Sequence, residues 1–163
     1  MQNLKHSWDV LRSNVQTYIK GLNFGYKSEL RQKHVTYINK HATFISPHEL
    51  NCTDSKGKSQ VITGARFVVA VGGRPSALPC PGGEHVITSD DIFSLPTSPG
   101  KVCVIGGGYV ALECAGFLAG LEHGDVTVLV RSMPLRSFDR DVVKKVKNCI
   151  ISNKCIISSR MLC

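Results

Sequence analysis

The sequence predicts an α/β fold in which a helix and an antiparallel β-meander precede a partial parallel βαβ unit. Three observations carry this prediction: a helical apolar stripe near the N-terminus, short β-rich runs separated by turn residues, and an apolar strand that leads through three glycines into another helix. The chain has 163 residues, of which 42% are hydrophobic, enough to bury one good core or two small ones. We divide it into residues 1–75, a proline-rich connector at 76–100, and residues 101–163.

The N-terminal part begins with a helix predicted over residues 7–30, with Ser7 as a plausible N-cap. Its apolar stripe consists of Trp8, Leu11, Val15, Tyr18, Ile19 and Leu22. Strands are predicted at residues 35–39, 42–46, 49–53 and 60–63, with a polar turn at 54–58. The continuous apolar run at 67–71 is typical of a strand that is covered on both faces.

The connector holds most of the prolines, which favour extended crossings over long elements. Thr88 is expected to cap a short helical turn within it. The C-terminal part is then predicted to alternate strand and helix. Its strands are residues 101–105, 125–130 and 154–157, and its helices are residues 109–122 and 139–152.

The turn between the first strand and helix of the C-terminal part carries the spacing Gly106-x-Gly108-x-x-Ala111. Such a turn places backbone N–H groups at a helix N-terminus, where a diphosphate binds. Gly106 permits the tight turn, Gly108 admits the pyrophosphate, and the small Ala111 allows close packing of helix on strand. A glycine turn that serves packing alone is the alternative, but the flanking strands and helix favour a dinucleotide site.

The end of the second strand indicates which dinucleotide binds. A carboxylate there would bind the ribose 2′-hydroxyl of NAD, whereas this chain offers Arg131, Ser132 and Arg136. Two cations and a hydroxyl suit a 2′-phosphate. We therefore predict that the chain binds NADPH.

Taken together, the order of these motifs resembles the class I pyridine nucleotide-disulfide oxidoreductases, most closely thioredoxin reductase and thioredoxin-glutathione reductase. The resemblance covers residues 6–147 and includes 69–75, 88–93 and 106–118. It implies an NADPH-dependent, FAD-containing flavoprotein that reduces thioredoxin-like or glutathione disulfides in cell redox homeostasis. Glutathione reductase is the alternative family member.

The resemblance also assigns site residues and domains. The NADPH residues would be Gly106, Gly107, Gly108, Tyr109, Val110, Glu113, Arg131, Ser132 and Arg136, with Gly107 in place of the usual alanine. The FAD residues would be Ala42, Val71, Gly72, Gly73 and Arg74, with Val71 in place of the usual threonine. Residues 1–75 would then be part of an FAD-binding domain and residues 101–163 part of the NADPH-binding Rossmann domain.

Cysteine spacing limits what the chain can do alone. The family's redox pair has two cysteines separated by four residues, and no two of the seven cysteines here have that spacing. We expect an internal fragment that is inactive alone and lacks the dimer-forming domain of this homodimeric family, with no catalytic residue assigned. An NADPH-binding or protein-interaction module without catalysis is the alternative.

Other classes of function are disfavoured. The net charge of +8 raises nucleic acid as a partner, but the Lys and Arg residues are scattered and no nucleic-acid motif is present. His48 and Cys52 form at most half of a metal site, so no metal is expected. No secretory signal or membrane span is evident, and most cysteines are expected to be buried thiols. A cytoplasmic location is expected, with the mitochondrion as an alternative.

Overall fold

The computed structural model describes residues 6–121, 125–152 and 155–158. It divides into two compact units, one from Tyr18 to Arg74 and one that comprises the rest of the described chain. Helix α1, Trp8–Gln32, contributes its first ten residues to the second of these units. Ser7 starts this helix, because its hydroxyl accepts a hydrogen bond from the Val10 N–H at 3.4 Å. No residue of α1 is fully buried, and this includes the residues of the predicted apolar stripe.

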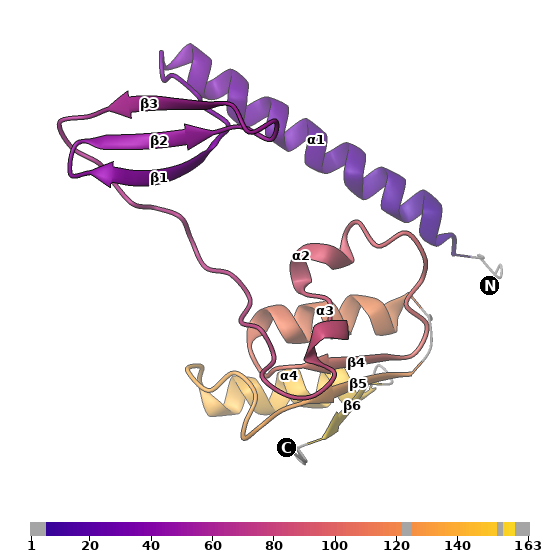
Figure 1. The fold of residues 1–163 in the computed structure, drawn as a ribbon. Coiled ribbons are helices and arrows are strands. Elements are labelled where there is room, and N and C mark those ends of the chain that lie inside the picture. Colours follow the sequence, from indigo (N-terminus) through magenta and orange to yellow (C-terminus); the bar gives the residue numbers. More distant parts are fainter. Residues whose placement is uncertain (1–5, 122–124, 153–154, 159–163) are drawn as a thin grey trace. The chain divides into compact units, whose positions relative to one another are not determined.

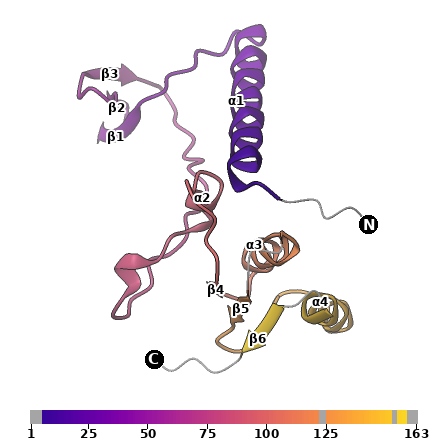
Figure 2. The same cartoon turned by 90° about the vertical axis from the view of Figure 1, so that its right-hand side faces the viewer.

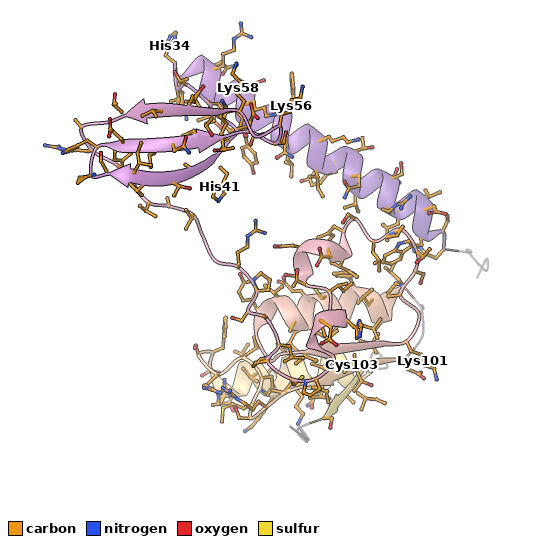
Figure 3. The ribbon with its side chains drawn as sticks, viewed as in Figure 1. His34, His41, Lys56, Lys58, Lys101 and Cys103 are labelled. Carbon is orange, nitrogen blue, oxygen red and sulfur yellow. The ribbon has the colours of Figure 1, made fainter. Side chains whose placement is uncertain are left out.

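The unit from Tyr18 to Arg74 contains the predicted meander (Figure 1). Its strands are β1 (His41–Ser46), β2 (Glu49–Thr53) and β3 (Ser59–Thr63), paired antiparallel in that order. Asp54 closes the turn between β2 and β3, where Figure 3 labels Lys56 and Lys58. Its carboxylate accepts the backbone N–H groups of both lysines at 3.0 Å.

Two strand predictions in this unit are wrong. Residues 35–39 and 67–71 have no regular secondary structure. In the second segment the exposed fractions of Val68 and Val71 are 91% and 87%. A strand needs a neighbour for its backbone N–H and C=O groups, and no described strand pairs with either segment.

The other unit is built on a parallel sheet in the order β4-β5-β6. Its strands are β4 (Val102–Ile105), β5 (Val126–Leu129) and β6 (Cys155–Ser158), and its helices are α2 (Ser89–Ile92), α3 (Tyr109–Gly120) and α4 (Arg140–Ser152). A single turn of 3₁₀-helix, η1, spans Gly83–His85. Thr88 caps α2 as predicted.

One face of this sheet is covered by helices α3 and α4 (Figure 2). Both crossovers run in the same direction along the sheet, and right-handed connections then place both helices on one face. Val126 and Val128 are buried on that face, together with Leu112, Ala115 and Leu118 of α3. The sheet and α3 therefore form the core that holds the glycine turn in place.

The opposite face of the sheet is more exposed within the described residues. Cys103 (labelled in Figure 3), Ile105 and Ile156 are all exposed. Cys149 on α4 is also exposed, and Cys52 is the only buried one of the five cysteines whose burial the structure describes. The expectation that most cysteines are buried is therefore wrong, because alternation along β4 turns Cys103 away from the helices.

Candidate nucleotide-binding site

The candidate site begins at the turn between β4 and α3. Gly106 has a φ of +138°, and a Cβ added to it would lie 3.4 Å from the Cβ of Ala111. Gly108 is the N-cap of α3, and a Cβ added there would meet nothing within 4 Å. Glycine has no side chain to cap the first N–H groups of the helix, so these can bind an anion. The close approach of Gly106 to Ala111 is the one expected from the motif.

Gly107 fits closely against the end of the second strand. A Cβ at this position would lie 2.7 Å from Cγ1 of Val130 and 3.3 Å from Cα of Pro134. Val130 is buried and its β-branched side chain is stiff. Because Gly107 has no methyl group, the segment after β5 can pack directly against the glycine turn.

A backbone hydrogen bond joins the two segments that sequence analysis assigned to the nucleotide. The N–H of Leu135 donates to the carbonyl oxygen of Gly107 at 2.7 Å. The loop 130–139, which carries Arg131, Ser132 and Arg136, is thus attached directly to the glycine turn.

The side chains of Arg131, Ser132 and Arg136 in this loop are all exposed. A guanidinium N–H of Arg136 donates to the Ser132 hydroxyl at 2.9 Å, which draws two of the three together. Within the described residues, neither Arg131 nor Arg136 forms an ion pair with a carboxylate. Their charges therefore stay available for an anionic ligand.

Helix α3 carries the remaining predicted nucleotide residues. Tyr109, Val110 and Glu113 lie on its first turns and are exposed. Cys114, which follows Glu113, is partly buried. Burial raises the pKa of its thiol, and the Glu113 carboxylate adds to this effect. Cys114 is therefore held in the unreactive thiol form, which argues against a nucleophile here.

Sequence analysis missed Arg140, the first residue of α4. Its guanidinium contacts four residues of the loop: Met133, Pro134, Leu135 and Phe138. Asp139 before it accepts the N–H groups of Asp141 and Val142 at 3.0 Å each, which fixes the start of α4. An arginine after a phenylalanine and an aspartate gives no sequence signal for this role, because its acceptors are backbone carbonyls and one methionine sulfur.

The residues assigned to FAD are not brought together into a comparable site. Ala42 is exposed on β1, and residues 71–74 are exposed and irregular. A Cβ added at Gly72 or Gly73 would meet nothing within 4 Å, so no close neighbour explains either glycine. The assignment of these residues to FAD therefore stays a prediction.

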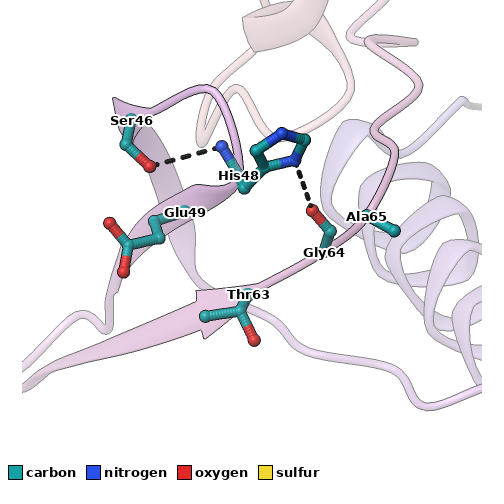
Figure 4. Close-up of a pocket in the computed structure, with 6 residues that line it drawn as sticks. All are labelled: Ser46, His48, Glu49, Thr63, Gly64 and Ala65. Carbon is teal, nitrogen blue, oxygen red and sulfur yellow. Dashed lines mark hydrogen bonds between the residues drawn. The ribbon is translucent and has the colours of Figure 1, made fainter.

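A separate shallow pocket lies at the end of the meander (Figure 4). It is lined by Ser46, His48, Glu49, Thr63, Gly64 and Ala65. Nδ1 of His48 lies 3.1 Å from the carbonyl oxygen of Gly64, and the N–H of Gly64 donates to the carbonyl oxygen of His48. His48 thus fastens the β1–β2 turn to the end of β3. The described residues contain no cluster of three or more metal-ligating side chains.

The fold and the glycine turn define a dinucleotide-binding α/β protein. Residues 2–158 match the family described as pyridine nucleotide-disulphide oxidoreductase. The chain is 48% identical over 139 residues to thioredoxin reductase SEP1 of Emiliania huxleyi, an alignment that covers 85% of this chain and 28% of that protein. The chain therefore belongs to the pyridine nucleotide-disulphide oxidoreductase family, as predicted, and membership implies a flavin and a pyridine nucleotide as cofactors.

A solved structure supports the same fold. The HOCl-induced flavoprotein disulfide reductase RclA of Escherichia coli, solved as a Cu(II) complex of a cysteine-to-serine mutant, superposes with a TM-score of 0.61 at 25% identity. The match covers 88% of this chain and 34% of that one. The chain thus spans about a third or less of the length of these relatives. Among the described helices, none combines the length and apolar character needed to cross a membrane.

Proposed function

We propose that this chain carries the NADPH site of a flavin disulfide reductase of the thioredoxin-reductase type. The observation that carries the proposal is the hydrogen bond between Leu135 and Gly107, which joins the anion-binding turn to a loop with two arginines. The 48% identity to a thioredoxin reductase supports the choice of subfamily. The substrate of such an enzyme would be a thioredoxin-like or glutathione disulfide.

The choice of NADPH over NADH rests on charge. The 2′-phosphate is the one group that distinguishes the two nucleotides, and it needs cationic or hydroxyl donors. Arg131 and Arg136 supply guanidinium groups, and Ser132 supplies a hydroxyl 2.9 Å from Arg136. No acidic side chain occurs between Val130 and Phe138, so nothing in that stretch favours an unphosphorylated ribose.

The role of each part follows from its chemistry. The N–H groups at the start of α3 would bind the diphosphate, and the arginines would orient the adenosine end. When bound, NADPH supplies a hydride, and a complete enzyme of this family passes it to a flavin and then to a dithiol. The sequence has no pair of cysteines separated by four residues, so we propose that the chain by itself does not reduce disulfides.

The arginines provide the test. Replacing both, in Arg131→Ala/Arg136→Ala, is expected to weaken NADPH binding at least about tenfold, because charge-assisted hydrogen bonds to the phosphate are lost. NADH binding should stay nearly unchanged. Titration calorimetry with each nucleotide measures both dissociation constants.

A matched control removes two positive charges at another place in the chain. Lys144→Ala/Lys145→Ala changes two exposed cations on α4 and should leave the ratio of the two affinities unchanged. An equal loss of NADPH and NADH affinity in the arginine variant would remove Arg131 and Arg136 from the 2′-phosphate site. A wild-type chain without preference for NADPH would overturn the proposed cofactor.

A further inference from the structure

We propose that Arg140 sets the preference for NADPH without touching the nucleotide, by holding the loop 130–139 in the shape that presents Arg131, Ser132 and Arg136. The inference rests on the proposed function, since it concerns the same site. It makes Arg140 a positioning residue for cofactor specificity.

The contacts of the Arg140 guanidinium are directed inward to the loop. Nε and Nη2 donate to the carbonyl oxygen of Phe138 at 3.1 and 2.8 Å. Nη1 contacts Sδ of Met133 at 3.2 Å and the carbonyl oxygen of Pro134 at 3.5 Å. Nη2 also donates to the carbonyl oxygen of Leu135. One side chain therefore collects backbone oxygens from three loop residues.

These contacts use the full donor capacity of the side chain. A guanidinium has five N–H donors, and the structure gives Arg140 five contacts to four acceptor atoms, all within the loop. Arg131 has no hydrogen bond or ion pair to any described residue, and Arg136 donates to Ser132 alone. Arg131 and Arg136 can therefore donate to a phosphate, whereas all N–H donors of Arg140 are used within the loop.

The backbone of the loop needs such support. Leu135 has a φ of +48°, a backbone conformation that residues other than glycine rarely adopt. Its N–H donates to Gly107, and its carbonyl oxygen accepts from both Arg140 and the Phe138 N–H. Arg140 therefore stabilises the residue that attaches the loop to the glycine turn. Without it, Leu135 is expected to relax and Arg136 to lose its position relative to that turn.

A lysine at position 140 distinguishes an effect of the positive charge of Arg140 from an effect of its hydrogen-bonding geometry. Arg140→Lys keeps the positive charge but replaces a planar five-donor group with a compact ammonium, which cannot reach three carbonyl oxygens and a sulfur together. If Arg140 acted by attracting the phosphate, the lysine variant would retain the preference for NADPH. If it acts by positioning, the lysine variant loses that preference.

The experiment measures binding and loop structure in the full chain. Dissociation constants for NADPH and NADH are determined by calorimetry, and exchange of the Leu135 amide is followed by NMR without nucleotide. We expect Arg140→Lys to lower the ratio of NADPH to NADH affinity about tenfold, with NADH affinity nearly unchanged. The Leu135 amide should lose its protection in the same variant. Lys144→Ala, which removes a charge on the same helix, should change neither quantity.

Each outcome decides a separate question. A wild-type chain without preference for NADPH overturns the proposed function and this inference with it. A wild-type preference that survives in Arg140→Lys overturns this inference alone. Loss of the preference with an intact Leu135 amide would also contradict positioning, because the loop would have kept its attachment to the glycine turn. The amide readout needs no nucleotide, so it tests the loop independently of the cofactor.

Discussion

Gly107 has little space for a side chain, although alanine is usual here in the family that the sequence resembles. A methyl group would lie 2.7 Å from Cγ1 of Val130, which is buried and stiff. We expect Gly107→Ala to lower the free energy of unfolding by about 1–3 kcal/mol, the usual cost of overpacking. Urea denaturation measures this change.

A second substitution tests the cause. Val130→Ala removes the clashing methyl, so Gly107→Ala/Val130→Ala should be more stable than the sum of the two single effects predicts. Gly116→Ala is the matched control, because a Cβ at that α3 position meets nothing within 4 Å. It should raise stability by about 0.5–1 kcal/mol. Additive effects of the first two changes would contradict the clash.

At the level of elements, α2 is a short helix that depends on its cap. The Asp91 carboxylate accepts the Thr88 N–H at 2.8 Å and the Thr88 hydroxyl at 3.0 Å, and the hydroxyl accepts the Asp90 N–H at 3.2 Å. The backbone hydrogen bond from Thr88, followed by the hydroxyl, lowers the pKa of Asp91 below its ordinary value of 3.8. The capping box therefore depends on an ionised Asp91.

The sign of the pH effect follows from this shift. A carboxylate with a lowered folded-state pKa stabilises the fold above pH 3.8, and the contribution is lost as the pH falls through the folded-state pKa. An NMR titration of the Asp91 carboxyl carbon should give a midpoint below 3.8. Thr88→Val removes the hydroxyl but keeps the backbone N–H, so it should raise the midpoint part of the way. A wild-type midpoint at or above 3.8 would exclude the cap from the acid response.

The elements that were predicted correctly from the sequence have recognisable sequence patterns at their ends. The capping pattern at Thr88, the turn at Asp54 and the glycines before Tyr109 each fix a boundary through neighbouring residues. Helices α2 and α3 begin where expected, and β2 ends where expected. The failed strands at 35–39 and 67–71 have strand-like composition but no partner among the described strands. Pairing is a tertiary property, so composition alone could not show its absence.

The site was predictable in part for the same reason. Gly106, Gly108 and the arginines lie at fixed offsets within a βαβ unit, and their residue types favour anion binding. Arg140 and the fit between Gly107 and Val130 were not predictable, because they depend on backbone carbonyls and on side-chain packing. Neither a carbonyl acceptor nor a filled space leaves a pattern in the sequence.

At the scale of the whole molecule, the residues assigned to the two cofactors differ in how well the structure supports them. The residues assigned to the nucleotide lie between Gly106 and Arg136, within one unit that has its own core of α3 and the parallel sheet. The residues assigned to FAD lie in the unit from Tyr18 to Arg74, on an exposed strand and an irregular segment. The residues assigned to the nucleotide therefore share one packed core, whereas those assigned to FAD do not.

This difference predicts how the chain behaves as a purified protein. Preorganised sites bind more tightly, since ordering a loop such as 71–74 costs about 1–2 kcal/mol per residue. We expect the chain to bind NADPH but to retain far less than one flavin per chain. Absorbance in the flavin band, measured after acid release, gives the flavin content. NADPH titration of the same sample shows that the protein is folded. A stoichiometric flavin would mean that residues 71–74 do form a cradle, which would contradict this prediction.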